Sequence, residues 1–163
     1  MNILLNERVR VATSSQGIVY EEYGKGMVTE EYNKLTTPVG GEYSLVLSDG
    51  TKVFLNADSE LKYPVEFSDG KRIVDLKGEA YFEVHKDSLR PFIVRMNGAE
   101  VTVLGTSFNV NTYGDDGQIY TTLVNGSVRV SSVKNGQAEV LKPGMQSVMN
   151  VQSGLLTVRK VDV

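Results

Sequence analysis

The stretch Leu45-Val-Leu-Ser-Asp-Gly-Thr-Lys-Val-Phe-Leu55 places the turn dipeptide Asp49-Gly50 between two runs of β-forming residues. Both central positions of a type I′ turn require positive φ, which Asn, Asp and Gly tolerate best. The stretch therefore predicts a β-hairpin closed by a type I′ turn.

The same turn chemistry recurs along the chain. Pairs of Asp or Asn followed by Gly separate apolar runs at Asp49-Gly50, Asp69-Gly70, Asn97-Gly98, Asp116-Gly117, Asn125-Gly126 and Asn135-Gly136. Pairs at this spacing predict successive hairpins, and Asn125-Gly126 is expected to close one just as Asp49-Gly50 does.

The segments between the turns alternate at period two, as half-buried strands do. Ala80, Phe82 and Val84 are expected on one face, with Tyr81, Glu83 and His85 on the other. Further apolar positions extend the pattern at Val101, Val103, Phe108, Val110, Val128, Val130, Val148 and Val151. No stretch keeps a 3.6-residue period. We therefore predict an all-β fold, a jelly-roll-like β-sandwich of successive antiparallel hairpins with a short N-terminal β meander.

The chain is expected to divide into three parts. Residues 1–35 form a β-rich lead-in, with short strands at Arg8–Val11, Gly17–Tyr20 and Met27–Thr29. Residues 36–150 form the sandwich, and residues 151–163 form a terminal strand. The seam between the lead-in and the sandwich is placed at Thr36–Gly41, because Pro and Gly cluster there.

Composition excludes several classes of function. The 163 residues carry a net charge of −3 and no cysteine. The charge argues against a nucleic-acid binder, and the absence of cysteine excludes thiolate metal sites and disulfides. No segment is apolar over the length of a membrane helix, and the N-terminus does not read as a signal peptide.

Residues that could support catalysis are few. His85 is the only histidine, so the chain cannot form a metal site that needs several histidines. We expect His85 to be exposed on the surface. Glu79 and Glu83 lie four residues apart on one strand, which places them about 13 Å apart at about 3.3 Å per residue. That separation exceeds the range of a glycosidase pair.

Loop motifs are equally weak. Asp115-Asp116-Gly117 and Asp49-Gly50 lack the alternate oxygens of a calcium loop, and Gly24-Lys-Gly26 lacks the third glycine of a phosphate loop. Asn125-Gly-Ser127 matches a glycosylation acceptor but lies on an expected turn. We therefore expect no catalytic, cofactor-binding or metal-binding residue, and the sequence selects no strand as a partner-binding surface.

Between Thr36 and Met145 the chain resembles the FecR family of transmembrane sigma-factor regulators. The motifs that carry the resemblance are Thr37–Tyr43, Leu47–Ser59, Leu61–Pro64, Arg72–Val84, Arg90–Val94, Val103–Val110, Thr121–Val128 and Leu141–Gly144. Several of these residues have a local role in any β fold. Gly78 and Gly105 are expected to allow a bulge or a close backbone approach, and Phe82, Phe92 and Phe108 are expected in the core.

The resemblance implies a role in signalling. It implies a periplasmic domain, anchored to the inner membrane by a helix outside this chain. The domain would relay the state of a TonB-dependent outer-membrane receptor, through the signalling domain of that receptor. The target would be an extracytoplasmic-function sigma factor, bound by a cytoplasmic segment outside this chain. The resemblance also implies a C-terminal domain after residue 163, and no small-molecule substrate, cofactor, nucleic acid or enzymatic activity.

Two other functions remain open from the residues themselves. A carbohydrate-binding β-sandwich module would need an exposed aromatic platform, and the absence of tryptophan counts against it. A β-sandwich hydrolase is disfavoured by the single histidine and the unpaired carboxylates. Exposed sheet edges could in addition accept a partner strand by β-augmentation.

Overall fold

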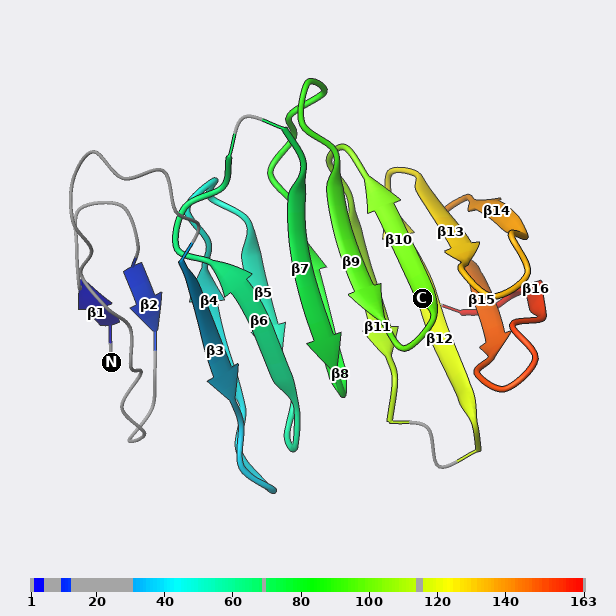
Figure 1. The fold of residues 1–163 in the computed structure, drawn as a ribbon, viewed down its shortest axis with the longest axis horizontal. Helices are drawn as coiled ribbons and strands as arrows, with labels where there is room; N and C mark the ends of the chain where they lie inside the picture. Colours follow the sequence, from blue (N-terminus) through cyan, green and yellow to red (C-terminus); the bar gives the residue numbers. More distant parts are fainter. Residues whose placement is uncertain (1, 5–9, 13–30, 69, 114–115, 163) are drawn as a thin grey trace.

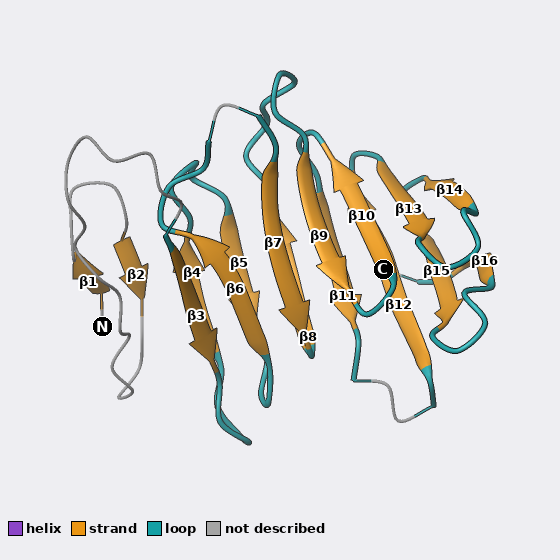
Figure 2. Cartoon of the chain, viewed as in Figure 1, coloured by secondary structure: helices purple, strands orange, loops and turns teal. Residues whose placement is uncertain are grey.

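A computed structural model describes residues 2–4, 10–12, 31–68, 70–113 and 116–162. Every regular element in these ranges is a β-strand, and the strands form two sheets that lie face to face (Figures 1 and 2). The expected all-β sandwich is therefore confirmed.

The first sheet, called sheet A, has nine strands. Their spatial order is β1 (Asn2–Leu4), β2 (Arg10–Ala12), β4 (Tyr43–Val46), β5 (Lys52–Leu55), β8 (Glu79–Glu83), β11 (Ser107–Asn111), β12 (Gln118–Asn125), β15 (Met145–Asn150) and β16 (Leu156–Lys160). All neighbouring pairs are antiparallel, and among the described residues β2 pairs with β4 through Arg10 and Val46.

The second sheet, called sheet B, has seven strands. Their order is β14 (Ala138–Leu141), β13 (Val128–Ser132), β10 (Ala99–Val103), β9 (Phe92–Met96), β7 (Arg72–Lys77), β6 (Glu60–Pro64) and β3 (Tyr32–Thr36). Strands β7 and β9 pair in parallel, because the chain crosses to sheet A and forms β8 between them. The other pairs are antiparallel.

Side chains at alternate positions along the strands point inward and fill the space between the sheets. Phe82 of β8 and Phe108 of β11 stack in sheet A, with ring centroids 5.1 Å apart and planes at 13°. Phe92 of sheet B meets Phe82 edge-on at 6.1 Å. All three side chains are fully buried, so the expected aromatic core is confirmed. Such burial contributes about 1.5–3 kcal/mol for each side chain.

The predicted type I′ turns are wrong at the described positions. Gly50, Gly98, Gly117, Gly126 and Gly136 have positive φ, whereas the Asp or Asn before each of them does not. Instead, the side-chain oxygens of Asp49, Asp116 and Asn135 accept the backbone N–H two residues further on. In each of these Asx-turns the side chain gives a backbone N–H of the loop its hydrogen-bond partner. Only the glycine must then take the left-handed conformation. Asp69 lies outside the described residues.

The dipeptide Asn125-Gly126 does not close a hairpin. Asn125 ends β12 in sheet A and β13 of sheet B begins at Val128, so the dipeptide lies where the chain passes from one sheet to the other. The hydroxyl of Thr106 donates to the carbonyl of Ser127 at 2.9 Å and holds this crossing in place. Gly126 takes positive φ as such a pair predicts, but an Asn-Gly pair does not distinguish a hairpin from a crossover.

Two glycines permit close backbone approaches, as expected. A Cβ on Gly78, which links β7 to β8 at φ +97°, would lie 2.2 Å from Oγ and 2.8 Å from Cα of Ser59. A Cβ on Gly105 would lie 2.8 Å from Cα of Lys86. The register shift in this region falls elsewhere, between Ser107 and Phe108.

Two further expectations have different outcomes. In β15 the buried residues are Ser147 and Met149, so the core position expected at Val148 is wrong by one residue, whereas Val151 does pack against the core. The last apolar positions are too irregularly spaced to define a parity. In the lead-in, β1 and β2 are described, and β2 includes the second half of the expected Arg8–Val11 strand. The first half of that strand and the strands expected at Gly17–Tyr20 and Met27–Thr29 lie outside the described residues.

Candidate functional site

A buried ion pair occupies one end of the sandwich. The Asp49-Gly50 turn places Asp49 Oδ2 2.7 Å from Nη1 of Arg72, the first residue of β7. Both side chains are excluded from solvent, with exposed fractions of 1% and 0%. Asp49 also accepts the backbone N–H and the hydroxyl of Thr51.

Every N–H of the Arg72 guanidinium has a partner. Besides Asp49, it donates to the carbonyls of Arg90 (2.8 Å), His85 (2.7 Å), Leu104 (3.2 Å) and Asp87 (3.4 Å). The group also lies 5.4 Å from the ring centroid of Phe92. A guanidinium has five donors, and here all five bind loops at this end of the sandwich. The pair therefore holds the loops together and leaves no donor for a ligand.

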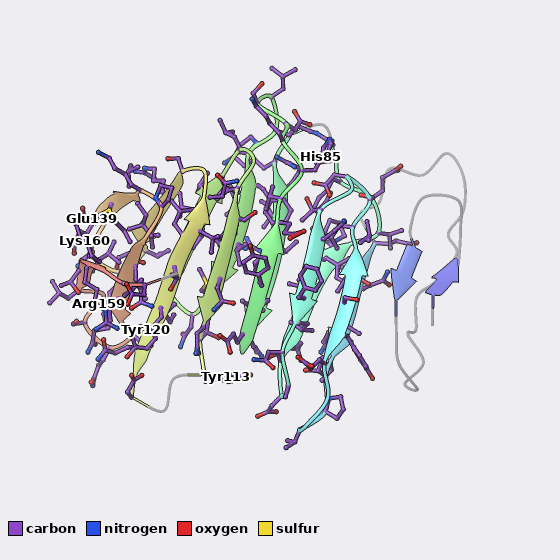
Figure 3. The ribbon with its side chains drawn as sticks, turned by 180° about the vertical axis from the view of Figure 1, so that it is seen from behind. His85, Tyr113, Tyr120, Glu139, Arg159 and Lys160 are labelled. Atoms are coloured by element: carbon purple, nitrogen blue, oxygen red, sulfur yellow. The ribbon has the colours of Figure 1, made fainter. Side chains whose placement is uncertain are left out.

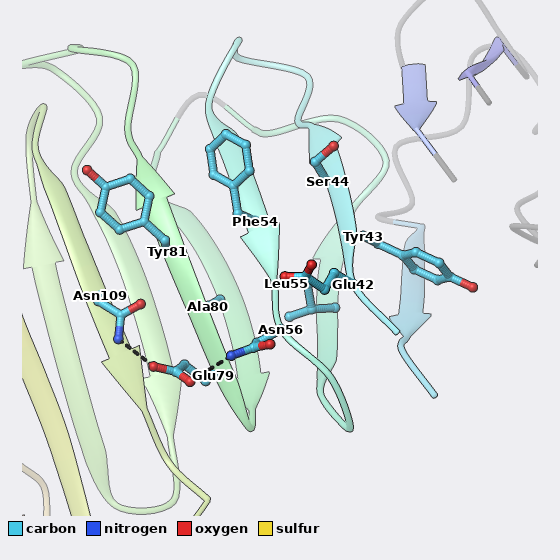
Figure 4. A pocket seen from close by; sticks show the side chains of 10 residues that line it. All are labelled: Glu42, Tyr43, Ser44, Phe54, Leu55, Asn56, Glu79, Ala80, Tyr81 and Asn109. Atoms are coloured by element: carbon cyan, nitrogen blue, oxygen red, sulfur yellow. Dashed lines mark hydrogen bonds between the residues drawn. The ribbon is translucent and has the colours of Figure 1, made fainter. Parts of the chain in front are cut away.

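A second polar cluster centres on Glu79, at the opposite end of β8 (Figure 4). Its Oε1 accepts Nδ2–H of Asn56 and its Oε2 accepts Nδ2–H of Asn109, both at 2.9 Å. Asn56 follows β5, and its own Oδ1 accepts the N–H of Ala57 at 2.8 Å. The carboxylate is thus held between two amides, with lone pairs left over on both oxygens.

The Glu79 cluster forms one wall of a shallow hollow on the outer face of sheet A, with a volume of about 380 Å³. The rings of Phe54 and Tyr81 form another wall, with centroids 6.1 Å apart and planes at 43° (Figure 4). Phe54 is 44% exposed. The described residues of the lining include two carboxylates and no lysine or arginine: Glu42, Tyr43, Ser44, Phe54, Leu55, Asn56, Glu79, Ala80, Tyr81 and Asn109.

Strand order creates this hollow. Phe54 of β5 is opposite Tyr81 of β8, and Tyr81 is opposite Asn109 of β11. Alternation predicts that each of these side chains faces outward. It does not predict that β5, β8 and β11 are neighbours, because other strands separate them along the chain.

A third group lies further along the same face of sheet A (Figure 3). The hydroxyl of Tyr120 donates to Asp116, which raises the pKa of Tyr120 and lowers that of Asp116. The guanidinium of Arg159 lies 5.7 Å from the centroid of the Tyr120 ring. Its Nε–H donates to Oε1 of Gln146 at 2.8 Å. This chain therefore places its own cation over this ring.

A larger hollow of about 830 Å³ lies along β6, β7, β9 and β10 of sheet B. Four of its charged side chains form ion pairs with one another. Arg95 donates twice to Asp75, at 2.9 and 3.2 Å, and this raises the pKa of Arg95. Glu60 lies 3.9 Å from Lys34 and 4.0 Å from Lys77.

The remaining candidates from the sequence do not converge. His85 is exposed, as expected, and Glu83 is exposed on the same strand as Glu79. Among the described residues, no three His, Asp or Glu side chains gather where they could hold a metal ion. Asp115 and Gly24-Lys-Gly26 lie outside the described residues. Within the described part of the chain, no helix has the length and apolarity needed to cross a membrane.

Comparison with known proteins gives one family. The family model of the FecR protein matches residues 33–129. Two crystal structures of proposed anti-sigma factors from Parabacteroides distasonis ATCC 8503 are similar to the chain. The one at 2.50 Å has a TM-score of 0.76, 35% identity and coverage of 81% of this chain. The one at 1.65 Å has a TM-score of 0.74, 37% identity and 80% coverage.

This chain spans only part of those proteins, 61% and 60% of their lengths. No curated protein matches it. The family match nevertheless covers more than half of the sequence, and it includes both Asp49 with Arg72 and Glu79 with its two amides. The chain belongs to the FecR family.

Proposed function

We propose that this chain is the signalling β-sandwich of a FecR-type anti-sigma factor. The observation that carries the proposal is the match to FecR, together with 35–37% identity to two proposed anti-sigma factors over about four-fifths of the chain. FecR proteins are regulators rather than enzymes. A regulatory role also agrees with the Arg72 network, whose donors all serve the fold.

In this proposal the domain lies in the periplasm, and a helix elsewhere in the protein anchors it to the inner membrane. It receives the state of a TonB-dependent outer-membrane receptor through the signalling domain of that receptor. A cytoplasmic segment then acts on an extracytoplasmic-function sigma factor. The proposed signalling unit is residues 36–150, to which β3 adds a strand of sheet B and β16 adds a strand of sheet A. Residues 1–35 are its proposed lead-in, and residues 151–163 are proposed to lead to a further domain.

The proposal can be tested in the native host with a reporter gene controlled by the cognate sigma factor. Removal of residues 31–162 from the full-length protein should uncouple the reporter from the inducer of the receptor. The cytoplasmic segment should still co-purify with the sigma factor, which shows that the truncated protein is present. An unchanged response to the inducer would reject a signalling role for this domain.

A further inference from the structure

Aromatic rings on the outer faces of the sandwich differ in whether the chain supplies them with a cation. On sheet B, Nζ of Lys62 lies 5.1 Å from the ring centroid of Tyr32. On sheet A, the Arg159 guanidinium lies over Tyr120. Phe54 and Tyr81 form the ring pair of the hollow, yet no Lys or Arg of the described chain lies over either ring or lines the hollow.

Two carboxylates on sheet B differ in the same way from those in the hollow. On the outer face of sheet B, Asp75 and Glu60 are paired with basic side chains. In the hollow, Glu79 is held by two neutral amides, and among the described residues neither Glu79 nor Glu42 forms an ion pair. The hollow therefore combines uncompensated negative charge with exposed ring faces.

We infer that this hollow is a binding site for an arginine side chain presented by a partner protein. A guanidinium is planar, stacks on aromatic faces and forms forked hydrogen bonds with a carboxylate. Phe54 and Tyr81 supply the ring faces. Glu79 supplies the free lone pairs, and Asn56 and Asn109 hold its carboxylate in a fixed orientation. The inference goes beyond the signalling role and does not depend on it.

A neutral sugar fits the hollow less well. It could pack on the rings, but it would leave both carboxylates without a counter-charge, and the rings are tilted at 43° instead of forming a flat platform. Electrostatic complementarity favours a cation, because opposite charge steers and aligns a partner at a negatively charged surface. Arginine is also among the residues most enriched at protein interfaces.

The test is an NMR titration of the ¹⁵N-labelled 163-residue chain with acetyl-arginine amide. Acetyl-citrulline amide, which has the same shape without the charge, is the matched control ligand. We expect saturable shifts at Phe54, Tyr81 and Asn109 with arginine and little response to citrulline. The response should weaken with added salt, since the hollow is open to solvent.

Variants locate the site. Glu79→Gln should weaken arginine binding about tenfold or more, as expected for loss of a charge-assisted hydrogen bond. Phe54→Leu removes an exposed ring with little risk to the fold and should also weaken binding. Asp75→Asn on sheet B should leave it unchanged. The spectrum of each variant shows whether it is folded.

Four results would overturn the inference. They are equal responses to arginine and citrulline, shifts centred on sheet B, no response to arginine, and a response to methyl glucoside in place of arginine. The last result would instead identify the hollow as a sugar-binding site. None of these results bears on the reporter experiment, so the two proposals can fail independently.

Discussion

The two ends of β8 hold two carboxylates in contrasting surroundings. Beyond one end, Asp49 is buried against Arg72, and the loop that follows β8 supplies carbonyls to the same guanidinium. At the other end, Glu79 opens onto a hollow, and among the described residues its carboxylate accepts from two amides. Both residues belong to motifs of the FecR resemblance, yet among the described residues only Asp49 has a cation to neutralise its charge.

This contrast separates a carboxylate that stabilises the fold from a carboxylate that is available to a partner. A buried carboxylate without a cation would be very unfavourable, so Asp49 and Arg72 must remain paired. A half-buried carboxylate in contact with water can remain unpaired at little cost. Glu79 is therefore free to interact with a partner, whereas Asp49 is not.

Breaking the buried pair should have the largest effect. Arg72→Met leaves the buried Asp49 without a cation and leaves loop carbonyls unsatisfied, so we expect a loss of about 3–5 kcal/mol in the free energy of unfolding. Urea denaturation measures this loss. A loss below about 1 kcal/mol would mean that the pair behaves like a surface ion pair.

At the end of β8 where Glu79 lies, the backbone conformation depends on Gly78. Gly78→Ala should cost roughly 2–4 kcal/mol, because it combines positive φ with a clash against Ser59. Gly40→Ala is the matched control, since Gly40 also has positive φ but a Cβ there would meet nothing within 4 Å. Equal losses in the two variants would show that the close approach to Ser59 is not restrictive.

The exposed pair on sheet B should contribute much less than the buried pair. Arg95→Met removes both hydrogen bonds to Asp75. We expect a loss of only about 0.2–1 kcal/mol in urea denaturation, because solvent screens both groups. A loss as large as that of Arg72→Met would contradict the distinction between buried and exposed pairs.

The smallest effect concerns Asp116 and Tyr120. The folded-state pKa of Tyr120 is raised above 10.0, so its contribution to stability is present below that pH and is lost as pH rises through the folded value. The pKa of Asp116 is lowered below 3.8, so its contribution is present above that pH and is lost as pH falls through the folded value. An NMR titration that follows the ring of Tyr120 should show that this residue titrates late. That signal should move to the ordinary range in Asp116→Asn, and persistence there would reject the assignment.

Local sequence patterns predicted much of this fold. Alternation correctly placed Ala80 and Phe82 inside and Tyr81 outside, because strand parity is set by neighbouring residues. The glycine pattern correctly located the close approach at Gly78. Turn type was predicted wrongly, because Asx side chains can cap a loop without taking positive φ themselves.

The candidate site was not predictable in the same way. The hollow depends on β5, β8 and β11 being adjacent, and that order follows from crossings between the sheets. Asp49 was read as a turn former, and nothing local shows that Arg72 would be its buried partner. The hollow and the Asp49–Arg72 pair are both formed by residues far apart in the sequence. Hydrophobic periodicity and turn motifs report on neighbouring residues and do not predict such contacts.

The most direct measurement compares Asp49→Asn with Glu79→Gln in the free energy of unfolding. Each change removes one negative charge and keeps a side-chain carbonyl. Asp49→Asn should cost several kcal/mol, since Arg72 would be left buried without a counter-charge, whereas Glu79→Gln should cost about 1 kcal/mol or less. Equal losses, or a larger loss at Glu79, would contradict the account that one carboxylate stabilises the fold while the other remains available to a partner.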